Sequence, residues 1–417
     1  MDSNVSVITL PGERNFAVVY PRGILFGLNA AQSELQELIS EATETASQPE
    51  TEYEFVAEYA ELSIIPTFDC TLACKYCYAR GGEFKDVMPL DTALTAISSQ
   101  REKGSKLKLS LVGGGEPLMY MDRVREIVRT AHEMYSEVDI GVVTNGTFSK
   151  DTLLWLAENN VRVRLSFDGV RHKYQRPFPD GSDSSELVIE NLKEAVKIGL
   201  DPIVQCIITA DGVGTMKDTV DLLVGLGVKT VKFEPALATD VSRATQEMEP
   251  DPKQYAEQLL DTIKYVAEKG YDIAIDTGYF SEPSTDYYCG MPTGNKILTP
   301  HGFITSCVEV SSCTDPYSSK IMVGKVGYDG VKFNEETQKF LSTLHYTNQK
   351  GCKSCNIRLI CHGGCPMANI WRGGFPLRKS SYTCTVEHSL VPPLLLLLAT
   401  DDRIAKVIME DPSIDRF

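Results

Sequence analysis

The sequence lacks the features that would direct it into a membrane, out of the cell or onto nucleic acid. Its opening, MDSNVSVITLPGERN, has neither the basic region nor the apolar region of a secretory signal. The longest apolar run, residues 394–398, is far shorter than the roughly 20 residues that span a bilayer, and we expect it to be a buried helical turn. A net charge of −16 would repel a phosphate backbone, and no basic stripe interleaves with aromatic residues. We therefore expect a cytoplasmic protein with no membrane or nucleic-acid partner.

Low-complexity segments and simple repeats are also missing, which argues against disordered and repeat architectures. A hydrophobic share of 42% with 24% charged residues is typical of a globular protein, and 417 residues suffice for a large α/β domain and a smaller one. Cysteine, in contrast, is abundant, with 12 residues. Because no secretory signal is evident, disulfides are not expected. The thiols point to metal binding instead.

The first part of the chain, residues 1–58, is predicted to form a small leading module. It holds two short strand-like runs, 5–10 and 16–20, then an apolar-periodic helix near 32–46 and a Glu-rich stretch. Two interpretations remain open: a truncated peptide-recognition element, or an extension that simply packs on the next domain.

The middle of the chain alternates strands with helical patterns of ten or more residues, which predicts parallel βαβ units. Six such units fit a partial barrel or a doubly wound sheet, and in both architectures ligands collect at the carboxyl ends of the strands. The expected strands are 61–68, 106–112, 139–144, 161–167, 202–209 and 229–234.

After about residue 272 the alternation of strands and helices ends. The share of Gly, Pro, Ser and Tyr increases and helical periodicity fades. Eight of the 12 cysteines fall between Cys289 and Cys384, which predicts a second domain built around metal. The expected division is 1–58, a leading module; 59–271, a partial barrel; 272–388, a cysteine-rich domain; and 389–417, a helical tail.

Three cysteines follow the first strand of the predicted barrel at gaps of three and two: Cys70, Cys74 and Cys77. Three thiolates at this spacing can wrap one side of a 4Fe–4S cube and leave one iron without a protein ligand. A structural zinc site is the alternative, but such a site requires four ligands, which usually come from paired Cys-x2-Cys turns.

This CxxxCxxC loop, with Tyr76 before the last cysteine, resembles the defining motif of the radical S-adenosylmethionine (radical SAM) superfamily. The resemblance implies that the open iron chelates S-adenosylmethionine, whose cleavage yields a 5′-deoxyadenosyl radical. It also implies a partial (β/α)6 barrel and a low-potential electron donor such as flavodoxin or ferredoxin.

Further motifs lie at the ends of the next strands and resemble the family's cofactor-binding positions. Glycines in such a turn let the backbone approach a ligand closely. The polar side chains could equally be helix N-caps, and the arginine could lie on the surface. The candidate cofactor-binding residues are Tyr76, Gly114, Gly115, Glu116, Pro117, Asn145, Ser166, Asp168 and Arg176.

The order and spacing of seven cysteines in the last part resemble the SPASM extension of radical enzymes that modify peptides. The resemblance assigns Cys352, Cys355, Cys361 and Cys384 to an outer auxiliary cluster and Cys289, Cys307 and Cys365 to an inner one. Three 4Fe–4S clusters are therefore expected. The inner cluster is one ligand short, so it either has an open iron or uses Cys313.

Other candidate residues have weaker support. Cys206, within a predicted strand, is expected to be a buried small hydrophobe. Asp276, at the expected domain junction, is a candidate proton acceptor from substrate. The motif-adjacent His172, His301 and His362 are expected to serve packing or capping.

The resemblance implies an enzyme that matures a ribosomally made peptide by thioether or carbon–carbon cross-linking. One alternative is oxidation of Cys or Ser to formylglycine in a sulfatase, which is disfavoured because no cysteine lies just upstream of Cys289. The other is a scaffold that keeps its clusters only for structure, which the complete Cys70, Cys74, Cys77 and Gly-Gly-Glu-Pro set disfavours.

Overall fold

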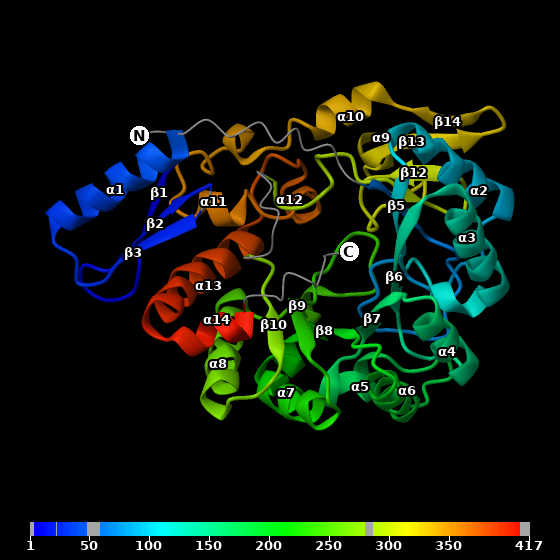
Figure 1. Ribbon diagram of the computed structural model, residues 1–417, viewed down its shortest axis with the longest axis horizontal. Helices are drawn as coiled ribbons and strands as arrows, with labels where there is room; N and C mark the ends of the chain where they lie inside the picture. Colours follow the sequence, from blue (N-terminus) through cyan, green and yellow to red (C-terminus); the bar gives the residue numbers. More distant parts are fainter. Residues whose placement is uncertain (1–3, 22, 48–58, 280–286, 409–417) are drawn as a thin grey trace. The chain divides into compact units, whose positions relative to one another are not determined.

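The computed structural model describes residues 4–21, 23–47, 59–279 and 287–408 (Figure 1). The chain divides into two compact units. Unit 1 comprises 1–56, 251–289 and 343–415; unit 2 comprises 57–250 and 290–342, with the last two residues of the chain. This grouping differs from the contiguous division expected from sequence, because segments far apart in the chain share the core of unit 1.

Unit 2 is built on a sheet whose first six strands run parallel, as the alternation of strands and helices predicts. In sequence order they are β4 (Ala60–Ile64), β5 (Lys106–Leu111), β6 (Glu137–Thr144), β7 (Arg162–Ser166), β8 (Ile203–Ile208) and β9 (Thr230–Pro235). Each strand pairs with the next one in sequence, so their carboxyl ends meet at one edge. That edge is where parallel sheets place their ligands.

Helices follow the strands and cover the outer side of the sheet (Figure 1). They are α2 (Leu90–Ser99), α3 (Met121–Met134), α4 (Lys150–Glu158), α5 (His172–Gln175), α6 (Ser185–Lys197) and α7 (Met216–Gly225). On α3 the buried residues Val124, Ile127, Val128 and Ala131 recur at helical spacing, which gives the helix one apolar face for the sheet. Short 3-10 helices are η1 (Gln100–Lys103), η2 (Pro117–Tyr120), η3 (Gly169–Arg171), η4 (Ala210–Thr215) and η5 (Gln246–Met248).

The sheet continues beyond β4 into a region where the sequence predicts no regular structure. β11 (Ile297–Leu298) pairs parallel to β4, and β12 (Phe303–Thr305), β13 (Met322–Gly327) and β14 (Gly330–Phe333) follow antiparallel. β11 and β12 have two and three residues, too few for a readable alternation, and β13 and β14 contain glycine, which is depleted in strands. The short helices α9 (Ser318–Ile321) and α10 (Glu335–Leu341) complete this part.

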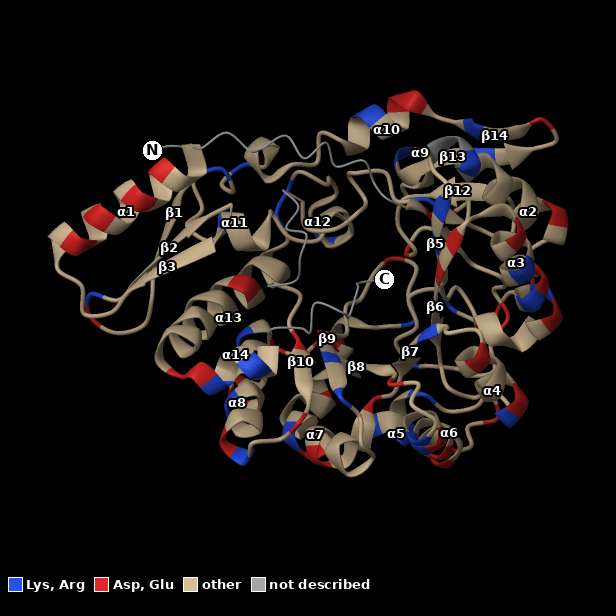
Figure 2. Cartoon of the chain, viewed as in Figure 1, with Lys and Arg blue, Asp and Glu red and all other residues tan. Residues whose placement is uncertain are grey.

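Unit 1 begins with an antiparallel sheet of β1 (Ser6–Thr9), β2 (Phe16–Tyr20) and β3 (Gly23–Gly27), followed by α1 (Gln32–Ser47). β1, β2 and α1 are close to the predicted elements, whereas β3 was not predicted. α1 packs on the sheet through Leu35 and Ala42 and exposes its acidic residues, which lie along its length in Figure 2.

The rest of unit 1 is mostly helical. It holds α8 (Pro252–Lys269), β10 (Ala274–Asp276), η6 (Tyr346–Asn348), α11 (Arg358–Cys361), α12 (Pro366–Gly373), α13 (Ser381–Thr400) and α14 (Asp402–Ile408). The face of the leading sheet formed by Ile8, Leu10, Ala17 and Val19 shares a core with Ile357, Val391 and Leu395. The leading sheet therefore shares its core with segments near the end of the chain, whereas the packing interpretation expected contact with the domain that follows it in sequence.

Helix α13 differs from the expectation of a short apolar turn. It spans 20 residues, continues through Pro392 and Pro393, and crosses the expected boundary at residue 388. By length and composition alone it could cross a membrane. It packs against α8, however, and buries Leu390, Val391, Leu394 and Leu395, as a core helix of a globular unit does.

Candidate functional site

The loop that carries Cys70, Cys74 and Cys77 lies between β4 and α2 and is tied to the glycine turn after β5. The Gly115 N–H donates to the Thr67 carbonyl at 2.9 Å, and the Glu116 N–H donates to the Asp69 carbonyl at 2.7 Å. A Cβ added at Gly115 would lie 1.9 Å from the Asp69 oxygen. Gly115 thus permits close contact between the glycine turn and the cysteine loop, and its expected approach to the cofactor stays a prediction.

Hydrogen-bond donors surround the three sulfurs. The Leu72 N–H lies 3.5 Å from Cys70 Sγ, and the Gly81 N–H lies 3.3 Å from Cys77 Sγ. The Asn145 amide nitrogen lies 3.7 Å from Cys70 Sγ, and Arg176 Nη1 lies 4.0 Å from Cys74 Sγ. Such donors stabilise thiolates that ligate a metal cluster, so these residues fit a site-differentiated 4Fe–4S cube.

The electrostatic surroundings of Cys70 and Cys74 disfavour their thiolate forms in the absence of metal. Burial, with the negative charge of Glu116, raises the pKa of Cys70 to about 12, and burial raises the pKa of Cys74 to about 11. Without metal these thiols would stay protonated at neutral pH. Bound iron reverses that preference, because a coordinating thiol loses its proton.

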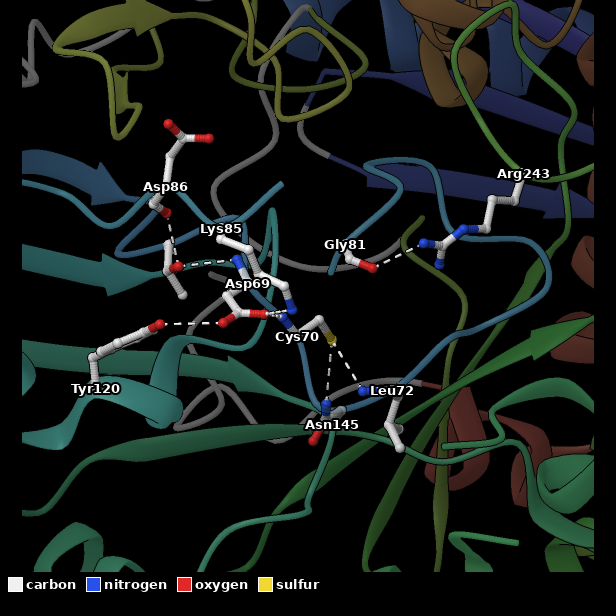
Figure 3. A network of polar contacts seen from close by, with 10 residues as sticks. Asp69, Cys70, Leu72, Gly81, Lys85, Asp86, Tyr120, Asn145 and Arg243 are labelled. Atoms are coloured by element: carbon white, nitrogen blue, oxygen red, sulfur yellow. Dashed lines mark hydrogen bonds and ion pairs between the residues drawn. The ribbon is translucent and has the colours of Figure 1, made fainter. Parts of the chain in front are cut away.

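Asp69, which directly precedes Cys70, holds the start of the loop (Figure 3). Its Oδ1 accepts the Cys70 N–H at 2.9 Å and the Lys85 ammonium, and its Oδ2 accepts the Tyr120 hydroxyl at 3.1 Å. Burial alone would raise the pKa of Asp69, but these bonds lower it below its usual range. The carboxylate therefore remains charged and fixes the backbone at Cys70.

Arg243 reaches the same loop from the segment after β9 (Figure 3). Its guanidinium donates to the Gly81 carbonyl at 2.9 Å and the Cys74 carbonyl at 3.4 Å, and its backbone N–H donates to the Cys77 carbonyl at 2.9 Å. Nothing in the sequence around Arg243 signals this role, because its partners lie about 160 residues away.

Glu116 and Asn145 support the loop from the ends of β5 and β6. The buried Glu116 carboxylate accepts the Asn145 N–H at 2.7 Å and the Thr144 hydroxyl at 2.7 Å. The Asn145 side chain donates to the Thr71 hydroxyl at 2.9 Å, within the cysteine loop. Both predicted residues thus brace the loop, and Pro117 occupies the first turn of η2 directly after Glu116.

Asp168 lies after β7 at the centre of a buried network. It accepts hydrogen bonds from the Tyr76 hydroxyl, from Arg176 Nε at 3.0 Å and from the Ile207 N–H at 3.0 Å. The surface alternative for Arg176 is wrong: the residue is buried, pairs with Asp168 and lies over the Tyr76 ring at 5.3 Å. Ser166 lies half-buried at the carboxyl end of β7.

Of the three motif-adjacent histidines, His172 is fully buried. Its Nδ1 accepts the Asp168 N–H at 3.2 Å, and its Nε2 lies 3.0 Å from the Ser184 hydroxyl. Burial lowers the pKa of His172 to about 4, so the ring is neutral. His301 pairs with Asp86 at 3.1 Å, and His362 Nε2 lies 2.7 Å from the Leu359 carbonyl. All three therefore have the packing or capping contacts that were expected.

Unit 1 contains a second concentration of thiols. A hollow of about 420 Å³, which includes space open to solvent, is lined by Cys352, Cys355, Cys361 and Cys384. These are the four cysteines assigned above to the outer cluster. No three His, Cys, Asp or Glu side chains of the described chain converge on a single-ion position. Four thiols are the ligand set that a 4Fe–4S cluster takes.

A buried acid also lines this hollow. Glu387 is 4% exposed and accepts the Tyr279 hydroxyl at 2.7 Å. Burial raises the pKa of Glu387 to about 7, although the bond from Tyr279 opposes the rise. Neither residue was predicted as functional, because Tyr279 and Glu387 meet only in the folded unit.

The remaining cysteines do not form one set within either unit. Cys289 and Cys365 belong to unit 1, whereas Cys307 and Cys313 belong to unit 2, so the inner cluster stays a prediction. Cys313 is exposed and lines a hollow on β13 and β14 in which no other cysteine takes part. Cys206 is buried on β8, as expected. Asp276 is buried at the end of β10 and accepts the Gly278 N–H at 2.8 Å.

Comparison with protein families identifies the domain that holds the first site. Residues 64–223 match the Radical SAM superfamily, so the chain contains a radical SAM domain. A probable GTP 3′,8-cyclase of Methanocaldococcus jannaschii is 29% identical over 153 residues, which cover 36% of this chain and 49% of the relative. The chain spans about half the length of the first curated relatives it matches.

Two solved structures share the fold over most of the chain. Native anSMEcpe with bound AdoMet and Cp18Cys peptide superposes with a TM-score of 0.68 at 19% identity, over 81% of this chain and 97% of that one. Streptococcus suis SuiB bound to precursor peptide SuiA superposes with a TM-score of 0.60 at 14% identity, over 92% and 99%. These superpositions show a shared α/β fold with a parallel-stranded sheet.

Proposed function

We propose that this chain, in which residues 64–223 form a radical SAM domain, is an enzyme that matures a ribosomally made peptide by a thioether or carbon–carbon cross-link. One observation carries the proposal: the same chain that holds the Cys70, Cys74 and Cys77 loop also gathers Cys352, Cys355, Cys361 and Cys384 around one hollow. A protein that kept its clusters only for structure would not need a three-cysteine motif that leaves one iron without a protein ligand. It would also not need a glycine turn packed against that motif.

The residues of unit 2 would hold the catalytic cluster and its cofactor. Cys70, Cys74 and Cys77 would ligate the cluster, and Gly114, Gly115 and Ser166 would line the cofactor's place at the carboxyl ends of the strands. When bound, the cluster and S-adenosylmethionine supply a 5′-deoxyadenosyl radical. A buried polar group beside Cys74 consists of Tyr76, Asp168 and Arg176. Within it, the charges of Asp168 and Arg176 neutralise each other.

The residues of unit 1 would hold an auxiliary cluster on the four thiols of the hollow. The order of the cysteines in the sequence supports a second auxiliary cluster, proposed on Cys289, Cys307 and Cys365, with an open iron rather than Cys313. Asp276 is proposed as the group that takes a proton from the substrate. A low-potential donor such as flavodoxin or ferredoxin would supply electrons.

A peptide partner is supported by fold likeness to anSMEcpe and SuiB, whose structures contain peptides. The curated GTP 3′,8-cyclase relative aligned above matches only 36% of this chain. The two sets of relatives therefore suggest different substrates, and the thiol-lined hollow of unit 1 favours the peptide.

The test is product analysis with the anaerobically reconstituted full chain, S-adenosylmethionine, a reductant and peptides encoded by open reading frames beside the gene. A side-chain-deuterated peptide should transfer deuterium to 5′-deoxyadenosine and lose about two hydrogens, the mass change of an oxidative cross-link. An aldehyde at Ser or Cys would instead indicate formylglycine formation. Turnover of GTP, with every peptide unchanged, would refute the proposal.

A further inference from the structure

Helix α13 presents two further polar side chains to the thiol-lined hollow of unit 1 beside its single cysteine, Cys384. Cys384, Glu387 and His388 all line it, and they lie at spacings of three and four residues. Side chains at such spacings share one face of a helix. The face that contributes a thiol therefore also contributes an imidazole.

His388 contacts another of the four thiols directly. Its Nε2 lies 3.5 Å from Cys355 Sγ, within hydrogen-bonding range for sulfur. Arg358, also at the hollow, is engaged elsewhere: its guanidinium donates to the Ser6 hydroxyl and to the Val5 and Cys355 carbonyls. His388 therefore brings a side-chain nitrogen within hydrogen-bonding distance of one of the four sulfurs.

The direction of that hydrogen bond follows from the chemistry of a ligating cysteine. A cysteine that binds iron is a thiolate, which has no hydrogen to donate and can only accept. The imidazole nitrogen must then carry the hydrogen. Hydrogen bonds to ligating sulfurs are one of the factors that set the reduction potential of an iron–sulfur cluster.

We propose that His388 is a positioning residue whose hydrogen bond to Cys355 Sγ raises the reduction potential of the cluster held by the hollow. The bond stabilises the more electron-rich, reduced state. This inference rests on the proposed function, because it requires a cluster on Cys352, Cys355, Cys361 and Cys384.

The experiment is an EPR-monitored redox titration of the reconstituted full chain. A background with Cys70, Cys74 and Cys77 replaced by Ala removes the signal of the catalytic cluster. On it, His388→Leu deletes the donor, His388→Gln keeps an N–H donor, and Thr385→Ala serves as a control on the same helix. The Thr385 hydroxyl donates to the Ser381 carbonyl at 2.8 Å, within its own helix.

His388→Leu should shift the midpoint potential to more negative values and alter the EPR signature while iron content stays constant. His388→Gln should restore much of the shift, and Thr385→Ala should leave the potential unchanged. An unchanged potential in His388→Leu with full iron overturns the inference but leaves the proposed function intact. Iron loss in His388→Leu equal to that in Cys355→Ala also overturns it, because His388 would then be a ligand. If replacing all four thiols removes no iron, the proposed auxiliary cluster itself is absent.

Discussion

At the scale of single residues, the cysteine loop depends on buried charges that are balanced in pairs. The side chains of Asp168 and Arg176 are 0% and 8% exposed. Removing one partner of such a pair leaves an uncompensated buried charge, which is far more costly than losing an exposed pair. Tyr76 donates to the same carboxylate, so the aromatic residue of the motif is linked to the arginine through Asp168.

His172 should make the stability of the domain depend on pH. Its pKa is lowered to about 4 in the folded protein, whereas an unfolded histidine titrates near 6.5. Above about pH 6.5 both states are neutral. As the pH falls from about 6.5 towards 4, only the unfolded state gains the proton, so stability is lost, on the order of 3 kcal/mol at the lower end.

Urea unfolding of the apoprotein at several pH values checks this expectation. His172→Asn should lower stability at pH 7.5 because it disturbs the contacts with Asp168 and Ser184, but its stability should fall less steeply between pH 6.5 and 4 than that of the native chain. Equal slopes for the two proteins would show that His172 is not the titrating group.

At the scale of elements, the turn after β5 is fitted to the cysteine loop so closely that Gly115 has no room for a side chain. Gly115→Ala would place a methyl group 1.9 Å from the Asp69 carbonyl oxygen and force the two segments apart. We expect loss of about four irons per chain, those of the catalytic cluster, together with S-adenosylmethionine binding. Gly214→Ala is the matched control, because its Cβ would meet nothing within 4 Å. Iron analysis that finds both variants equally loaded would contradict this account.

The leading sheet supports the thiol-lined hollow through a shared core. Ile8 is fully buried with Ile357, Val391 and Leu395, and Cys355 and Cys361 pack against the same cluster. Ile8→Ala should therefore cost about 3 kcal/mol and weaken iron retention in unit 1. Thr9→Ala, at the exposed neighbouring position, should change neither. If Ile8→Ala weakened peptide binding while iron and stability stayed unchanged, the leading module would be a recognition element instead.

The sequence predicts the elements whose signals are local. β4 to β9 follow from strands that alternate with helices, and the cysteine loop follows from its spacing. β11 and β12 are too short to show a pattern, and β13 and β14 contain glycine, which is depleted in strands. The extent of α13 is hidden by Pro392 and Pro393, because proline normally ends a helix. Arg243 and Tyr279 could not be predicted as site residues, because their partners lie far away in sequence.

At the scale of the whole molecule, each unit contributes a thiol set of its own. The loop of unit 2 has three cysteines and would leave one side of a cluster open, whereas four cysteines line the hollow of unit 1. Open coordination suits a cluster that binds a cofactor, and full coordination suits one that transfers electrons. The central claim is that the site of unit 2 binds the cofactor, whereas the site of unit 1 transfers electrons.

Iron analysis of the anaerobically reconstituted full chain and two multiple variants tests that claim most directly. The native chain should hold about twelve irons, from three cubes of four. Replacing Cys70, Cys74 and Cys77 with Ala should remove about four of them and all cleavage of S-adenosylmethionine. Replacing Cys352, Cys355, Cys361 and Cys384 with Ala should remove a different four and leave the reductive cleavage of S-adenosylmethionine measurable. Tightly bound zinc with little iron, or a four-thiol variant that retains all of its iron, would contradict the account.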